Sequence, residues 1–307
     1  MALLAANISA DGTVEKRVLD RVAEACLAAE SDRPVIAMIH GYRFSPTSPE
    51  HSPHRHIFSL SPKRSPRALS WPASLGADRP GGPLALAIGW EARGAFGGAY
   101  AQAEAAGLGL SRILRRVAQT RDRGSGGTRL LAHSLGARVA LESLPHLPPG
   151  AVSGAVLLAP AETRAAANAA LARAQAPPPI LSVRSRENLF FDLLMERALA
   201  PIGFGARSLG RGPLRREADW IDLAIDDAPT LAALATLGHE IAPPAHLVCH
   251  WSVYLRARLF DFYRDILTGA LPLPQLASAL PDPATPSSAL RALSVRLPLP
   301  FGAGQPS

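Results

Sequence analysis

The sequence changes from an apolar run to a helical pattern at Leu130-Leu131-Ala132-His133-Ser134-Leu135-Gly136. Residues 128–133 have the length and apolarity of a strand buried on both faces of a parallel sheet, and residues 137–144 have helical spacing. Ala132 and Gly136, on either side of Ser134, are small enough for a tight, strained turn from strand to helix. We therefore predict that this turn presents the Ser134 hydroxyl at the carboxyl end of a strand.

Outward from this turn, apolar runs and helical patterns alternate along the chain. The other predicted strands cover residues 1–10, 34–39, 84–90, 155–159, 180–183 and 220–225. The other predicted helices cover residues 13–29, 99–120, 164–174, 190–199, 230–237 and 251–267. This alternation predicts an α/β fold with a doubly wound, mostly parallel sheet.

Two segments interrupt the pattern. Residues 45–83 are rich in proline and are predicted to form a long irregular loop, which is uncommon inside a domain and often functional. Residues 269–307 form a second proline-rich stretch, predicted to be an extended or disordered tail. We therefore expect one domain over residues 1–268.

Charge and composition exclude several classes of protein. The 307 residues include 32 Lys+Arg and 25 Asp+Glu, a net charge of +7, yet no DNA- or RNA-binding motif accompanies the basic residues. A charged solvent-exposed surface is the simpler account, and we expect no nucleic-acid partner. Two cysteines cannot make a disulfide framework. No apolar run reaches the roughly 18 residues of a membrane span, and no signal-peptide pattern is present, so a cytoplasmic location is expected.

The turn at Ser134 resembles the nucleophile elbow of the α/β-hydrolase superfamily, G-x-S-x-G, with Ala132 in place of the first glycine. The resemblance covers roughly residues 34–255 and does not identify a subfamily. It implies an oxyanion loop that begins with His-Gly after an earlier strand, and His40-Gly41 stand there. The backbone amides of Tyr42 and Leu135 would then face the oxyanion.

A serine nucleophile needs a base to take its proton. The superfamily's order of nucleophile, acid and histidine places that base late in the chain, where His239, His246 and His250 occur. We choose His250 because it lies between an apolar run and a predicted helix. His133 is adjacent to Ser134 but is expected to point away from it along the strand.

The acid of the triad is less well defined by the sequence. Glu187 is the first carboxylate after the strand at 180–183, where it could hold the imidazole tautomer, and Asp192 is the alternative acid. Many superfamily members carry Asp in this loop, and the aligned position could fall on Asn188. The acid therefore stays open among Glu187, Asp192 and neither.

Three closely spaced histidines, His51, His54 and His56, fall in the loop at 45–83. Such a group can bind zinc, but no cysteine and no carboxylate other than Glu50 lies near it in the sequence. Contact with substrate, or a solvated loop, are the other interpretations. We expect no metal and no cofactor.

These features predict a serine hydrolase that cleaves a small-molecule ester, thioester or related acyl substrate, with Ser134, His250 and Glu187 as the triad. The first alternative is a catalytically silent α/β-hydrolase fold that serves as a binding or scaffolding module. The second is a basic protein that associates with nucleic acid or anionic membranes. Substrate identity and oligomeric state stay open.

Overall fold

A computed structural model describes residues 3–62, 69–121, 126–200, 207–212, 214 and 219–281. Within them, a seven-stranded sheet has the order β1-β3-β2-β4-β5-β6-β7, and every neighbouring pair is parallel. The strands are β1 (Leu3–Asn7), β2 (Val35–Ile39), β3 (Leu84–Gly89), β4 (Thr128–His133), β5 (Gly154–Leu158), β6 (Ile180–Arg184) and β7 (Trp220–Ala224). The predicted doubly wound parallel sheet is confirmed.

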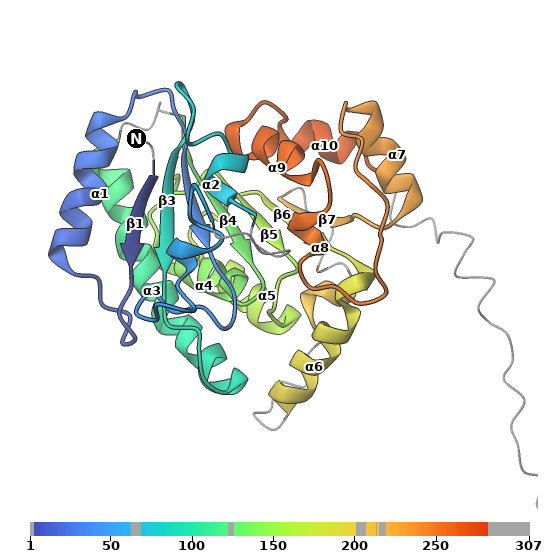
Figure 1. Ribbon diagram of the computed structural model, residues 1–307, viewed down its shortest axis with the longest axis horizontal. Helices are drawn as coiled ribbons and strands as arrows, with labels where there is room; N and C mark the ends of the chain where they lie inside the picture. The colour runs from blue at the N-terminus through green and yellow to red at the C-terminus, as the bar shows by residue number, and fades with distance from the viewer. Residues whose placement is uncertain are drawn as a thin grey trace, which may run out of the picture.

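Helices cover both faces of the sheet (Figure 1). One layer contains α1 (Lys16–Ala28), α3 (Phe96–Thr120), α4 (Gly136–Ser143), α5 (Arg164–Arg173) and α6 (Leu189–Leu199). The other contains α2 (Trp71–Ser74), α7 (Ala228–Thr236), α8 (Ser252–Leu255), α9 (Leu259–Thr268) and α10 (Leu273–Ala279). Short 3-10 turns are η1 (Pro53–Arg55), η2 (Leu144–His146), η3 (Arg186–Asn188) and η5 (Leu209–Arg211).

The continuous apolar run of β2 reflects burial on both faces. Its odd-numbered residues, Val35 to Ile39, join the core beneath α1, α3 and α4. Ile36 and Met38 point to the opposite side and join the core beneath α2, α8 and α9. Because successive side chains alternate across a strand, a strand covered on both faces must be apolar at every position.

Three details differ from the sequence-based expectations. The predicted helix at 251–267 is two helices, α8 and α9, because the chain turns between them and Arg258 adopts a left-handed conformation with φ 66°. The loop at 45–83 contains η1 and α2. Within the predicted tail, α10 packs Leu276 into the core, so the extended tail expected from residue 269 is wrong for this segment. Residues 282–307 lie outside the described part.

None of the helices described in the structure is both long enough and apolar enough to span a membrane.

Candidate active site

The turn between β4 and α4 holds Ser134 in a strained conformation. Its φ is 55°, in the left-handed region that a side chain with a Cβ rarely occupies. The Ser134 amide donates to the Leu158 carbonyl at 2.9 Å, and its carbonyl accepts from the Ala161 amide at 3.0 Å. A Cβ on Gly136 would lie 2.5 Å from the His40 carbonyl oxygen, so only glycine fits at that position. The surrounding backbone therefore enforces the turn.

The loop after β2 lies directly against this turn. A Cβ on Gly41 would lie 2.7 Å from Ser134 Cβ and 2.9 Å from the His133 carbonyl oxygen. Tyr42 follows Gly41, and its hydroxyl donates to the Gly94 carbonyl. The segment predicted to supply one oxyanion amide is thus in contact with the serine, and Leu135 begins the turn of α4 that follows it.

The buried imidazole of His40 fixes the conformation of this loop. The Trp90 amide donates to His40 Nε2 at 3.1 Å, so the proton is on Nδ1, which donates to the Gly41 carbonyl at 2.9 Å. The ring stacks on Trp90 with centroids 5.5 Å apart. Burial lowers the pKa of His40 to about 3, so the ring is neutral at pH 7. The sequence offered His40 only as the start of a motif and gave no signal of this role.

His250 lies beside the strand that ends at Ser134. Its ring centroid is 4.6 Å from that of His133, and His133 Nε2 is 3.3 Å from the His250 carbonyl oxygen. Phe191 packs against the other side of the imidazole at 4.8 Å. Burial, and to a lesser degree His133, lowers the pKa of His250 well below its usual value. A neutral imidazole therefore lies next to the serine turn, and the ring of His133 packs against it.

Asn188 is the side-chain partner of this imidazole. Its Oδ1 lies 2.6 Å from His250 Nδ1. An amide oxygen only accepts, so the proton is on Nδ1 and the lone pair of His250 is on Nε2. Asn188 ends η3, directly after β6, where parallel strands present side chains to the same edge as Ser134. The pair is thus built from segments more than sixty residues apart.

The α/β-hydrolase arrangement combines a parallel sheet with a serine at a strained turn from strand to helix and a histidine nearby. This chain has the parallel sheet, the left-handed Ser134 between β4 and α4, and His250 against the adjacent His133. The chain has the α/β-hydrolase fold.

No family model and no curated protein matches the chain. Esterase B from Lactobacillus rhamnosis, solved with a tributyrin phosphonate inhibitor, is similar with TM-score 0.33, 11% identity and coverage of 64% of this chain and 65% of its own. A YdeN-like hydrolase from Pectobacterium atrosepticum gives TM-score 0.31 and 15% identity, and the match covers 67% of this chain and 83% of the hydrolase. Prolyl oligopeptidase B from Galerina marginata gives TM-score 0.30 and 11% identity, and the match covers 81% of this chain and 33% of the oligopeptidase. The chain thus spans about two thirds of the length of esterase B.

Glu187 was predicted from the sequence to orient His250, but both oxygens of its carboxylate bind other groups. Its Oε1 accepts from the amides of Ala245 and His246 at 3.1 and 2.7 Å, and its Oε2 accepts from Arg256 at 2.8 Å. Burial raises the pKa of Glu187, but the Ser252 side chain, the His246 amide and the Arg256 guanidinium outweigh it and leave the pKa below the usual value. The carboxylate therefore anchors the loop that precedes His250. This is a structural role, and it differs from the predicted role of orienting the His250 imidazole.

The other candidate base and acid residues lie elsewhere in the fold. His239 Nε2 is 3.6 Å from Asp265, and His246 contributes its amide to Glu187. Asp192, the alternative acid, is buried in α6, one turn after Asn188, and its Oδ1 accepts from the Ser208 hydroxyl at 2.8 Å. Asn188, and neither of the carboxylates considered from the sequence, is therefore the hydrogen-bond partner of the imidazole.

The three histidines of the loop at 45–83 do not converge. His54 Nε2 lies 2.6 Å from Asn7 Oδ1 in β1, and His56 packs against Phe44 with ring centroids 5.4 Å apart. His51 is exposed. Within the residues that the structure describes, no three His, Cys, Asp or Glu side chains form a group that could hold a metal ion.

Exposed apolar side chains are concentrated in the two segments that carry Asn188 and His250. Of the eight exposed large hydrophobic residues in the described chain, six belong to the two segments that carry Asn188 and His250: Leu189, Phe190, Leu193, Leu194, Leu247 and Val248. We call these six residues the apolar rim. A backbone hydrogen bond from Cys249 to the Glu187 carbonyl, 2.8 Å long, joins the two segments.

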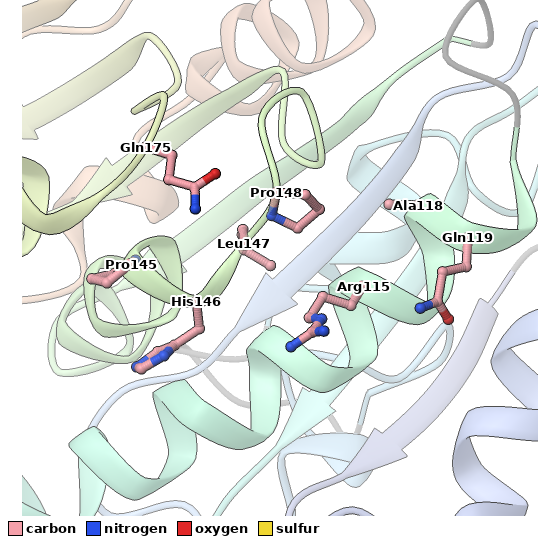
Figure 2. Close-up of a pocket in the computed structure, with 8 residues that line it drawn as sticks. All are labelled: Arg115, Ala118, Gln119, Pro145, His146, Leu147, Pro148 and Gln175. Atoms are coloured by element: carbon pink, nitrogen blue, oxygen red, sulfur yellow. The ribbon is translucent and has the colours of Figure 1, made fainter.

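A surface hollow of about 390 Å³ lies away from this site (Figure 2). Its lining includes Arg115 and Gln119 of α3 and His146 of η2. Because α3 ends before β4 begins, the hollow lies toward the amino edge of the sheet, whereas Ser134 is at the carboxyl edge. Ligands of open α/β sheets bind at the carboxyl edge, so the elbow remains the candidate site.

Proposed function

We propose that the chain is a serine hydrolase that cleaves an acyl substrate by way of an acyl-enzyme at Ser134. The observation that carries this proposal is the left-handed Ser134, which lies beside a buried neutral His250 whose Nδ1 is held by Asn188. That hydrogen bond leaves Nε2 free to act as a base. A serine hydroxyl is a weak nucleophile until such a base removes its proton.

In the proposed reaction, Ser134 Oγ attacks the substrate carbonyl while His250 Nε2 takes the hydroxyl proton. The amides of Tyr42 and Leu135 would stabilise the oxyanion, each by on the order of 3–4 kcal/mol. His250 then protonates the leaving group as the carbonyl–heteroatom bond breaks and the acyl-enzyme forms. Water, deprotonated by the same imidazole, releases the acid and restores Ser134.

The apolar rim supports a substrate with an apolar group. Large apolar patches on protein surfaces often mark binding sites, and these six exposed residues belong to the two segments that carry Asn188 and the proposed base. Phe191, which contacts the imidazole, continues the apolar surface toward the site. We therefore favour an ester or thioester with an apolar acyl chain over a highly charged substrate.

A catalytically silent binding module is the second candidate, and Asn188 is the observation that favours it. An amide fixes the imidazole tautomer but brings no negative charge to stabilise the imidazolium formed during attack. A silent binding module and a slow serine hydrolase can be told apart by one measurement. Only in the hydrolase is Ser134 acylated by a substrate or by an irreversible acylating analogue.

Hydrolysis of p-nitrophenyl esters of increasing acyl length tests the proposal. Ser134→Ala should abolish turnover, because no other hydroxyl occupies the strained turn, and should leave the circular dichroism spectrum unchanged. Ser278→Ala, at an exposed position of α10, is the matched control and should retain full activity. Equal turnover by wild type and Ser134→Ala would refute the proposed function.

A further inference from the structure

A buried carboxylate lies directly behind Asn188. Asp192 follows Asn188 by four residues, which is one helical turn along α6, and is 3% exposed. Its Oδ1 accepts from Ser208 Oγ at 2.8 Å. Its Oδ2 is buried and has no hydrogen-bond partner among the described residues. The carboxylate thus has one acceptor oxygen that the described residues leave unpaired.

Asn188 offers the donor that this oxygen lacks. Because Oδ1 of Asn188 faces His250, the amide NH2 group is at the other end of the side chain. The Asn188 side chain lowers the pKa of Asp192, as a donor facing the carboxylate does. Asn188 therefore lies between an imidazole that donates to it and a buried carboxylate with one oxygen that has no hydrogen-bond partner among the described residues.

The loop at 208–210 confines the carboxylate in this position. A Cβ on Gly210 would lie 2.4 Å from both Asp192 carboxylate oxygens, so glycine is required where the backbone closes over them. The Gly210 amide also donates to Ser208 Oγ at 3.1 Å, which orients that hydroxyl toward Asp192. The placement of Asp192 is therefore set by the fold.

We infer that Asp192 is a positioning residue that supplies, through the Asn188 amide, the negative charge that the proposed base lacks. The groups form a line from Asp192 through Asn188 and His250 to Ser134. A carboxylate accepting from the amide makes Oδ1 of Asn188 a stronger acceptor for His250 Nδ1–H. When His250 takes the Ser134 proton, both protons stay on the imidazolium, and Asp192 remains ionised. The inference rests on the proposed function and assigns to Asp192 a part other than direct contact with the imidazole.

The charge state of Asp192 gives this inference a pH signature. Burial raises its pKa to about 6; among its neighbours, Ser208 and Asn188 lower the pKa, Glu196 raises it and Arg211 lowers it. Glu196 and Arg211, from α6 and η5, pair with each other at 2.5 Å. The pKa of His250 is well below its usual value, so a decline in serine reactivity near pH 6 would report Asp192.

The experiment measures the rate at which a fluorophosphonate labels Ser134 in the full chain, from about pH 5 to about pH 9. Asp192→Asn keeps an acceptor for Ser208 but removes the charge. It should label about tenfold more slowly at high pH and should lose the decline near pH 6. A purely structural role would not remove that decline.

Glu196→Gln is the matched control on the same helix. It should label at the wild-type rate at high pH, because the Glu196 carboxylate contacts the Ser208 amide and Arg211 and makes no hydrogen bond to Asn188 among the described residues. It should also move the decline to lower pH, since the Glu196 charge raises the pKa of Asp192. If Asp192→Asn fails to fold, Glu196→Gln still tests the inference. A labelling rate that declines at the same pH in Glu196→Gln as in wild type would overturn it.

The exchange Asn188→Asp with Asp192→Asn keeps the net charge and brings the carboxylate into direct contact with His250. It should label at least as fast as wild type and faster than Asp192→Asn alone. Asp192→Asn that labels like wild type at every pH would overturn the role of Asp192 while the serine hydrolase stands. Absence of labelling at Ser134 in wild type would instead refute the proposed function.

Discussion

Gly41 and Ser134 touch across the carboxyl edge of the sheet, where a Cβ on Gly41 would lie 2.7 Å from the Cβ of Ser134. The contact joins the loop after β2 to the turn after β4, which are adjacent strands. The strained backbone of Ser134 and the closely packed backbone of Gly41 therefore lie in direct contact.

Gly41→Ala should disturb that arrangement. The added methyl group meets Ser134 Cβ and the His133 carbonyl, so we expect a loss of about 1–3 kcal/mol in the free energy of unfolding and a large loss of esterase activity. Urea unfolding and ester hydrolysis measure the two effects. Gly97→Ala, in α3 with open space around it, is the control and should be neutral or slightly stabilising. Full activity in Gly41→Ala would contradict the proposed placement of the oxyanion loop.

The sequence was a good guide to the fold because the strands are buried on both faces and are therefore continuous apolar runs. The predicted strand at 34–39 is β2, and the predicted helix at 164–174 is α5 within one residue. The break at Arg258 could not be predicted, because a left-handed arginine leaves no signal in the apolar spacing. The helix α10 was hidden by neighbouring prolines, one of which lies in its first turn, where proline is tolerated.

The site was less predictable than the fold for a physical reason. Local pattern locates Ser134, but the partner of His250 depends on how segments about sixty residues apart meet in three dimensions. Glu187 and Asn188 are adjacent in the sequence, yet their side chains face Arg256 and His250 respectively. Choosing a carboxylate by residue type therefore selected the wrong neighbour.

Asn188→Ala should lower the catalytic rate while the fold survives. Without the amide oxygen, His250 Nδ1 loses its acceptor and the tautomer with a free Nε2 is no longer favoured. We expect the kcat for ester hydrolysis to fall by roughly 10–100-fold with a smaller change in KM. Asn168→Ala, on the exposed side of α5, is the matched control. A wild-type kcat in Asn188→Ala would mean that the hydrogen bond has no part in catalysis.

Acid should destabilise the protein through its buried histidines. Burial lowers the pKa of His40 to about 3 and that of His133 to about 4, against about 6.5 in the unfolded chain. The unfolded state therefore binds protons first as the pH falls, and stability present above pH 6.5 is lost toward pH 4. Each histidine contributes about 1.4 kcal/mol per pH unit over that window. The raised pKa of Asp192 acts in the opposite direction below about pH 6 and offsets part of the loss.

Urea unfolding at a series of pH values measures this effect. His133→Phe, which keeps a ring against Trp71 and Tyr254, should lose less stability than wild type between about pH 7 and about pH 5. His146→Phe, at an exposed position, should follow the wild-type curve. Identical curves for wild type and His133→Phe would show that burial of this imidazole carries no pH-dependent cost.

The apolar rim should control the preference for acyl chain length. Leu247 is 96% exposed, and Leu247→Ser should lower kcat/KM for long-chain p-nitrophenyl esters several-fold while that for the acetate changes little. The comparison of long and short chains cancels any general loss of activity. Leu27→Ser, at a residue 73% exposed on α1, removes a similar apolar surface far from the site and should change neither value. Equal effects of the two variants would deny the rim a role in substrate binding.

Covalent labelling tests the central claim most directly. The full-length protein is treated with a fluorophosphonate, digested and analysed by mass spectrometry to locate the modified residue. A nucleophile activated by His250 predicts one adduct on Ser134, lost in His250→Ala and absent from the other serines. An unlabelled protein that keeps its native circular dichroism spectrum, or an adduct on another residue that persists in Ser134→Ala, would contradict a serine hydrolase built on this turn.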